Sequence, residues 1–107
     1  MQPAQDDIAL VRGGGDIATG VVWRLHHAGF RVVVAELPQP LTIRRTVAVS
    51  SAVISGHIDI EGLTARRCND ELSVRSCWDL GEVPVVVAPT LADVPLSQQV
   101  RSIIDCR

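Results

Sequence analysis

Residues 7–20 read DIALVRGGGDIATG, and this stretch decides the fold that we predict for the chain. An apolar run typical of a β-strand meets three glycines, and an apolar pattern with helical spacing begins directly after them. The first turn of a doubly wound α/β fold has this layout, because its backbone must turn sharply there and present free N–H groups to a ligand. We therefore predict a βαβ unit that begins with these residues.

The segments that follow extend this unit into a mostly parallel sheet. From Asp16 to Gly29 apolar residues recur at helical spacing, at positions 17, 21, 25 and 28. Residues 30–36 and 84–88 are rich in valine, which is typical of strands buried on both faces. Aromatic residues make up only 3% of the chain, so the core must be built from small aliphatic side chains. The predicted fold class is α/β, Rossmann-like, with a mostly parallel sheet.

The remaining segments predict smaller elements. Residues 41–47 are read as a short helix, and residues 57–60 and 63–67 as a small antiparallel β-hairpin that turns at Glu61-Gly62. A further helix is expected to begin with Asn69 as its N-cap and to end at Gly81, with apolar positions Leu72, Cys77 and Leu80. The last apolar residues, between 100 and 104, fit either a helix or a strand.

Composition sets limits on the class of protein. With 107 residues we expect residues 1–107 to form a single Rossmann-like domain that is incomplete, the N-terminal part of a longer protein. A net charge of -2 argues against nucleic-acid binding, and no apolar run is long enough to span a bilayer. The polar, acidic N-terminus is unlike a signal peptide, so we expect a cytoplasmic protein. The three cysteines have no CxxC spacing, and we expect reduced thiols rather than a disulfide framework or a zinc site.

The glycine turn matches the dinucleotide fingerprint GxGxx(G/A) at Gly13, Gly15 and Ala18. The first glycine makes the tight turn, the second lets the backbone approach a pyrophosphate, and the small third residue allows close packing of helix and strand. Glu36 ends the next predicted strand about twenty residues farther on, where a carboxylate can bind ribose hydroxyls. In the competing interpretation the glycines only make a tight turn and bind nothing.

Several residues around the turn are candidates for contact with a cofactor. Asp16 complicates a phosphate site, because its carboxylate suits the helix dipole but repels a bound phosphate. His26 and His27 are interpreted as surface residues, and no nucleophile, base and orienting group come together, so no catalytic set is named. The predicted cofactor-binding residues are Gly13, Gly14, Gly15, Asp16, Ile17, Ala18, Thr19 and Glu36, with Arg44 and Arg45 as a second possible contact to an anion.

Beyond the glycines, longer matches carry a resemblance to a known family. They are Val11–Gly20, Arg24–His26, Ala28–Phe30, Glu36-Leu37, Gln39-Pro40, Ile43–Val47 and Gly81–Val85. Together these residues resemble the YqeB-type family of the selenium-dependent molybdenum hydroxylase system. The combination of RGGGDIATG with a downstream IRRTV is far more specific than the glycines alone. Ala88 departs from the family pattern, which has an aspartate at that position, and residues 50–53 depart from it as well.

The resemblance implies an accessory or maturation protein with a Rossmann-like region, of greater length than this chain. A molybdopterin dinucleotide carries the pyrophosphate that such a turn accepts, as NAD does, so either dinucleotide is a possible cofactor. The partners implied are a molybdenum hydroxylase apoprotein or other maturation factors. Two alternatives remain open: a fragment of an NAD-dependent oxidoreductase, and a scaffold without catalytic activity that binds only a partner protein.

Overall fold

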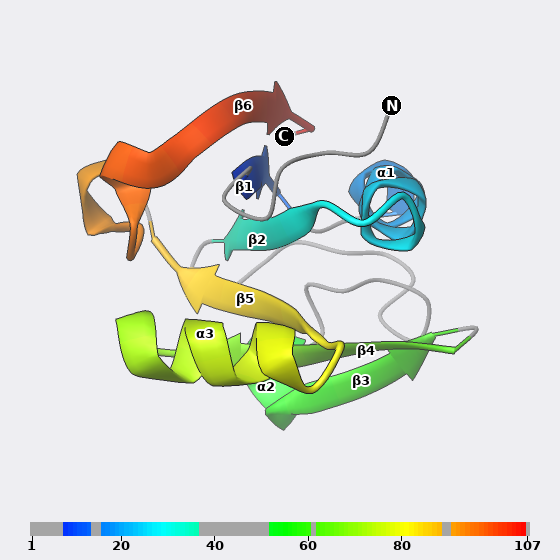
Figure 1. Cartoon of the computed structure of the whole chain (residues 1–107). Coiled ribbons are helices and arrows are strands. Elements are labelled where there is room, and N and C mark those ends of the chain that lie inside the picture. Colours follow the sequence, from blue (N-terminus) through cyan, green and yellow to red (C-terminus); the bar gives the residue numbers. More distant parts are fainter. Residues whose placement is uncertain (1–7, 14–15, 37–51, 61, 89–90, 107) are drawn as a thin grey trace.

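The computed structural model describes residues 8–13, 16–36, 52–60, 62–88 and 91–106. The first three elements are the predicted βαβ unit, and two short 3₁₀ turns, Leu91–Asp93 and Ser97–Gln99, precede the last strand (Figure 1). In chain order the strands and α-helices are β1 (Ile8–Arg12), α1 (Asp16–His27), β2 (Arg31–Glu36), α2 (Ala52–Ser55), β3 (His57–Ile60), β4 (Leu63–Cys68), α3 (Glu71–Asp79), β5 (Val83–Val87) and β6 (Val100–Asp105).

The strands form one six-stranded sheet in the order β3-β4-β5-β2-β1-β6. All neighbouring strands are parallel except β3 and β4, whose antiparallel pairing confirms the predicted hairpin. Because the five parallel strands share one direction, their carboxyl ends lie along the same side of the sheet, which we call the carboxyl edge. The opposite side is the amino edge. The predicted α/β class with a mostly parallel, Rossmann-like sheet is confirmed.

The strand order reverses at β1. The chain adds β2 and then β5 on one side of β1, and afterwards crosses back so that β6 pairs with the other side. Within residues 91–99 this crossover contains only the two 3₁₀ turns and no α-helix. In open α/β sheets, ligands bind outside the carboxyl ends of the strands at such a reversal. The fold therefore directs attention to the place where β1 and β6 end.

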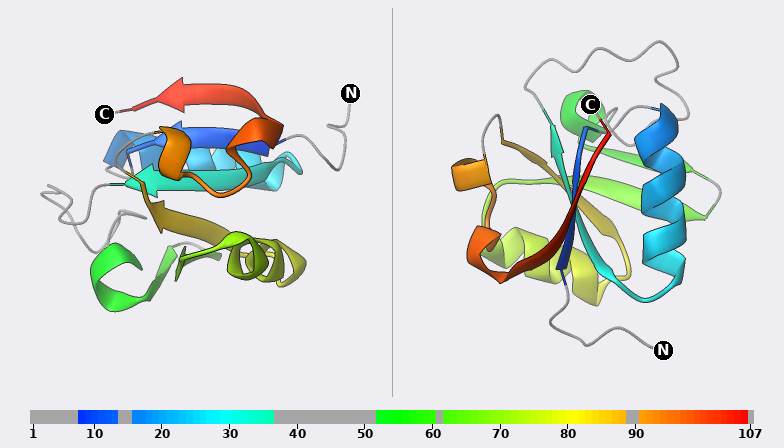
Figure 2. Two further views of the ribbon diagram at one scale, coloured as in Figure 1. Left: turned by 90° about the vertical axis from the view of Figure 1, so that its left-hand side faces the viewer. Right: turned by 90° about the horizontal axis from the view of Figure 1, so that it is seen from above.

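The core consists of two layers, one on each face of the sheet. Along β2, Val32 and Val34 belong to the cluster that contains residues of α1 and α2, whereas Val33 and Ala35 belong to the cluster that contains residues of α3. This alternation is expected because successive side chains of a strand point to opposite faces. Helices α1 and α3 accordingly cover opposite faces of the sheet (Figure 2).

The buried side of α1 differs from the apolar pattern read from the sequence. Ile17 is 80% exposed and Ala28 is also exposed, whereas Ala18 and Val22 are completely buried against the sheet. The other two apolar positions, 21 and 25, are partly buried. Alanine at position 18 presents little bulk, so the helix can rest closely on the strands there. That close contact turns Ile17 outward.

Helix α3 begins one residue later than predicted. Asp70 is the N-cap, not Asn69: its Oδ1 accepts a hydrogen bond from the Ser73 N–H at 2.8 Å, and the Ser73 Oγ accepts one from the Asp70 N–H at 3.1 Å. This reciprocal capping box satisfies two backbone donors that would otherwise lack partners in the first turn. Asn69 would also be a good N-cap by residue type, so composition alone could not choose between them.

The face that α3 buries was also misread. Leu72 is 76% exposed and Leu80 is 72% exposed, while Val74 and Cys77 are buried and Trp78 packs partly buried beside them. Only Cys77 of the three predicted apolar positions is therefore in the core.

The other predicted elements have mixed outcomes. The two valine-rich strands are confirmed as β2 and β5, and the C-terminal segment, for which helix and strand were both open, is strand β6. Residues 52–55 form a single helical turn, and the helix predicted for 41–47 lies outside the described residues. In the part of the chain that the structure describes, no helix is both long and apolar enough to cross a membrane.

Candidate functional site

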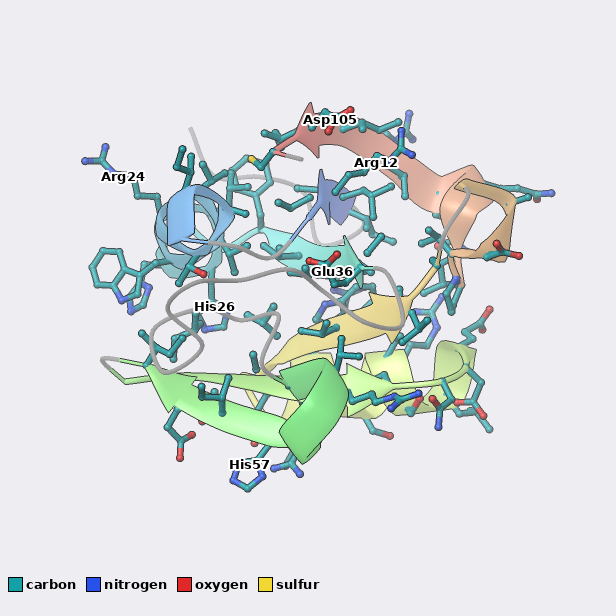
Figure 3. The ribbon with its side chains drawn as sticks, turned by 180° about the vertical axis from the view of Figure 1, so that it is seen from behind. Arg12, Arg24, His26, Glu36, His57 and Asp105 are labelled. Atoms are coloured by element: carbon teal, nitrogen blue, oxygen red, sulfur yellow. The ribbon has the colours of Figure 1, made fainter. Side chains whose placement is uncertain are left out.

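The ends of β1 and β6 form the centre of the candidate site. Arg12, the last residue of β1, lies opposite Asp105, the last residue of β6, and the Cys106 N–H donates a hydrogen bond of 2.9 Å to the Arg12 carbonyl. Figure 3 shows the two labelled side chains close to each other near the ends of these strands. The reversal of strand order thus brings a cation and an anion together at the carboxyl edge.

Gly13 makes the turn that leaves β1. Its φ is +93°, a backbone conformation that residues with a side chain rarely adopt. Its N–H donates to the Ala35 carbonyl at 2.8 Å, so this donor completes the pairing with β2 and does not point at a ligand. The predicted role of the first glycine as a turn residue agrees with this geometry. Gly14 and Gly15 lie outside the described residues.

The first turn of α1 starts at the carboxyl edge, since the helix begins at Asp16. Ala18 is buried against the sheet, as a small third residue of the fingerprint should be, and Thr19 is 7% exposed and has an interaction partner. Ile17 is 80% exposed and lies beside the turn. A large exposed aliphatic side chain at this place can contact an apolar part of a ligand.

Glu36 is the last residue of β2 and lies on the same edge. Its side chain is half-buried and already has an interaction partner, and its carbonyl accepts a hydrogen bond of 2.9 Å from the Ala88 N–H. Figure 3 shows the Glu36 side chain at the end of the strand that neighbours β1. The predicted position of this carboxylate relative to the turn is therefore present, while Arg44 and Arg45 lie outside the described residues.

Two residues of this edge were not predicted from the sequence, Arg12 and Asp105. Both come at the end of an apolar strand, and a polar residue in that position was a signal that could have marked them. Asp105 was missed because the state of residues 100–106 was left open. Its place beside Arg12 depends on the long crossover from β5, which no local pattern shows.

His26 and His27 lie away from this edge, at the C-terminal end of α1. His27 is exposed, stacks on Trp23 with ring centroids 4.0 Å apart, and is linked through Nδ1 to the Trp23 carbonyl at 2.8 Å. His26 is half-buried, and burial, followed by the charge of His27, lowers its pKa. It contributes to a pocket of about 270 Å³ at the amino edge, where β2 begins, together with Gly29, Phe30, Arg31, Trp78 and Asp79. The surface prediction therefore fits His27 better than His26.

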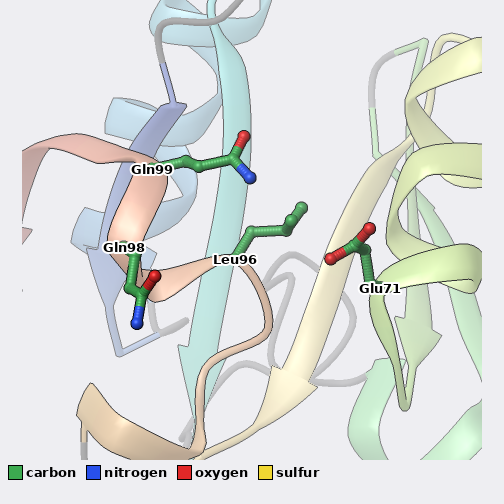
Figure 4. A pocket seen from close by; sticks show the side chains of 4 residues that line it. All are labelled: Glu71, Leu96, Gln98 and Gln99. Atoms are coloured by element: carbon green, nitrogen blue, oxygen red, sulfur yellow. The ribbon is translucent and has the colours of Figure 1, made fainter.

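A second hollow lies between α3 and the crossover to β6. It has a volume of about 280 Å³ and is lined by Glu71, Leu96, Gln98 and Gln99 (Figure 4). Neither hollow is lined, among the described residues, by Gly13 or by the first turn of α1. Among the described residues, no three His, Cys, Asp or Glu side chains are grouped so that they could hold a metal ion. Of the predicted residues that the structure describes, Gly13, the first turn of α1 and Glu36 lie at the carboxyl edge.

Comparison with known proteins gives one informative relative. The chain is 41% identical over 87 residues to the uncharacterized protein YqeB of Escherichia coli strain K12. This similarity supports the resemblance of the chain to the YqeB family. The match covers 81% of this chain but only 16% of the length of that relative. No family model matches the chain, and no solved structure matches it.

Proposed function

We propose that this chain binds a dinucleotide, or another nucleotide-bearing cofactor, at the carboxyl edge where β1 and β6 end. The observation that carries the proposal is the sequence of strand, positive-φ Gly13 and helix α1 at the reversal of strand order. Backbone N–H groups at a helix N-terminus attract phosphate oxygens, and the reversal leaves a crevice in which the ligand can lie.

The residues of this edge fit such a cofactor. In the proposal Gly14, Gly15 and Asp16 contribute backbone N–H groups to the pyrophosphate, while Arg12 adds a positive charge nearby. Exposed Ile17 contacts the apolar face of a base or ring, and Glu36 accepts hydrogen bonds from ribose hydroxyls. A carboxylate at this position favours a ribose without a 2′-phosphate, so NAD is preferred over NADP.

The similarity to YqeB supports the family resemblance, and it is that resemblance which implies a place in molybdenum enzyme biosynthesis. We propose that it is an accessory or maturation factor for selenium-dependent molybdenum hydroxylases, and that it acts in the cytoplasm. Its cofactor is then a molybdopterin dinucleotide, which carries the same pyrophosphate as NAD. Its partner is a hydroxylase apoprotein or another maturation factor.

One observation favours a second candidate, an NAD-dependent oxidoreductase. Glu36 has the position of the ribose-binding carboxylate in NAD enzymes, but among the described residues no nucleophile, base and orienting group come together beside it. The third candidate is a scaffold that binds only a partner protein. It gives the exposed Ile17 and the position of Glu36 no role in binding a nucleotide.

Calorimetric titration of the protein with NAD, NADP, ATP and a molybdopterin dinucleotide distinguishes the three candidate functions. The proposal expects saturable binding of a dinucleotide and no hydride transfer. Binding of NAD with substrate-dependent hydride transfer would establish the oxidoreductase instead. A folded protein that binds none of the four ligands would favour the scaffold.

The role of Glu36 is tested with the variant Glu36→Gln. Loss of a charged hydrogen-bond acceptor should weaken NAD binding by roughly 10- to 100-fold, equivalent to about 1.5 to 3 kcal/mol. Asp79→Asn is the matched control, because it removes one carboxylate at the amino edge. Equal affinities of the wild type and Glu36→Gln would remove this residue from the site.

The proposed partner is tested separately. Purified hydroxylase apoprotein should co-elute with the protein in size-exclusion chromatography, and a hydroxylase that already holds its cofactor should not. If both forms of the hydroxylase co-elute with the protein equally, or if neither does, the result contradicts a maturation role.

A further inference from the structure

Two of the three cysteines lie together in the core beneath α3. Cys68 ends β4 and is 3% exposed, and Cys77 is in the last part of α3 and is 2% exposed. Both are free thiols and belong to the same buried cluster on the α3 face of the sheet. The third, Cys106, is half-buried and packs against the cluster on the opposite face.

A hydrogen bond holds the Cys68 thiol against α3, close to Cys77. The Cys68 Sγ donates to the Ser73 carbonyl at 3.5 Å, and Ser73 precedes Cys77 by one helical turn on the same face of α3. In an α-helix this carbonyl faces the backbone N–H four residues later, which is that of Cys77. The Cys68 thiol therefore lies next to the helical turn that carries Cys77, and the two elements are joined only by Asn69 and Asp70.

The surroundings make the two thiols unequal. The hydrogen bond from Cys77 lowers the pKa of Cys68, and Ser73 and Arg66 act in the same direction. The pKa of Cys77 is raised, first by its hydrogen bond to Cys68 and then by burial. Cys68 is therefore the thiol that loses its proton more readily, and the thiolate is the form that reacts with an oxidant.

We propose that Cys68 and Cys77 are an oxidisable thiol pair that closes to a disulfide within the chain. With hydrogen peroxide as oxidant, the Cys68 sulfur attacks one peroxide oxygen, the O–O bond breaks and water leaves, so that Cys68 becomes a sulfenic acid. The Cys77 sulfur then attacks the Cys68 sulfur. The S–S bond forms, the S–O bond breaks, and the hydroxide leaves as a second water with the Cys77 proton. The thiols lose two electrons and the peroxide gains them.

The new bond would tie the end of β4 to the face of α3 that packs on the sheet. Because β4 ends at the carboxyl edge, oxidation would tie the last part of α3, through Cys77, to the strand end at the edge that carries the proposed nucleotide site. The disulfide is independent of that function, since it requires no nucleotide. Cys106 belongs to the other core layer and stays reduced.

The test is a count of thiols in the folded protein. The wild-type protein is exposed to hydrogen peroxide at neutral pH, then denatured and alkylated with iodoacetamide, and its intact mass is measured. The reduced protein takes up three alkyl groups, one for each cysteine, and we expect the oxidised protein to take up one. Three alkyl groups after oxidation would overturn the proposal.

Peptide mapping identifies the bond. Trypsin cuts after Arg67, Arg75 and Arg101, so Cys68, Cys77 and Cys106 fall in three different peptides. The proposal expects peptides 68–75 and 76–101 to be linked until a reductant is added. A link to the peptide that contains Cys106 would contradict it.

Variants provide the controls. Cys106→Ser should keep the link between residues 68 and 77, whereas Cys68→Ser and Cys77→Ser should each lose it. If the buried variants fail to fold, the wild-type peptide map still decides the question.

Discussion

The indole Nε1 of Trp78 in α3 donates a hydrogen bond of 3.0 Å to the carbonyl of Val32 in β2. The register of β2 and β5, in which Val34 lies opposite Val85, places the backbone nitrogen of residue 84 where it would donate to this carbonyl. Residue 84 is proline and has no N–H. Trp78 thus replaces a ladder hydrogen bond that Pro84 cannot make.

This replacement predicts that Trp78→Phe destabilises the protein. The Val32 carbonyl would lose its donor while remaining next to the core, which costs about 1 to 3 kcal/mol of the free energy of unfolding. Urea unfolding measures the change. Trp23→Phe is the matched control, because Trp23 is 38% exposed on α1, and it should have a smaller effect.

A second variant tests the mechanism itself. Pro84→Ala restores an N–H at the position facing Val32, so Trp78→Phe should be less harmful in that background, by about 1 kcal/mol. Equal effects of Trp78→Phe in both backgrounds would show that only lost packing matters.

Two glycines of the first βα unit should respond oppositely to alanine. Gly13 has a φ of +93°, so Gly13→Ala should lower the free energy of unfolding by about 1 to 2 kcal/mol. Gly20 is exposed within α1 and has open space around an added Cβ, so Gly20→Ala should raise it by about 0.5 to 1 kcal/mol. Urea midpoints of the two variants check both signs. A stabilised Gly13→Ala would contradict the described turn.

Glu82 predicts a loss of stability in acid. Arg66 donates to it from Nε at 2.7 Å and from Nη2 at 3.2 Å, and these hydrogen bonds hold the pKa of the Glu82 carboxyl below its ordinary value. The folded state therefore favours the carboxylate. Its contribution is complete above the ordinary glutamate pKa of about 4.3 and is lost as the pH falls through the lower folded pKa.

Unfolding in urea between pH 7 and pH 3 measures this dependence. Glu82→Gln should make the fall in stability shallower than in the wild type. Glu71→Gln should leave the slope nearly unchanged, because the Glu71–Arg75 pair is exposed and 3.4 Å long. An identical slope for Glu82→Gln and the wild type would contradict the assignment.

The parts of the fold that follow from local pattern were predicted well. Strands β1, β2 and β5 are short apolar runs between glycines, prolines or charged residues, and each is marked by residues inside the segment itself. The hairpin of β3 and β4 was also marked in the sequence, by a glycine between two short strand patterns. In the structure this residue, Gly62, has the positive φ that suits such a turn. Which side of each helix faces the sheet was harder to predict. Ile17 and Leu72 have the spacing of buried residues but lie on the exposed sides of short helices.

The parts of the candidate site that depend on distant pairing were not predictable in this way. Gly13, Ala18 and Glu36 come from one βαβ unit, whose geometry is nearly constant, so their arrangement followed from spacing. The position of Asp105 beside Arg12 requires β6 to return to the far side of β1. The contact between Trp78 and Val32 likewise arises only once Pro84 takes its place in the sheet.

The central claim, that a nucleotide binds at the carboxyl edge, is tested most directly by amide chemical shifts. The protein is labelled with ¹⁵N and titrated with NAD and then with ADP. We predict saturable shifts at Gly13, Ile17, Glu36 and Asp105, with the amino-edge residues around Trp78 unchanged. Shifts confined to the amino-edge pocket, or no shifts with either nucleotide at millimolar concentration, would contradict the account.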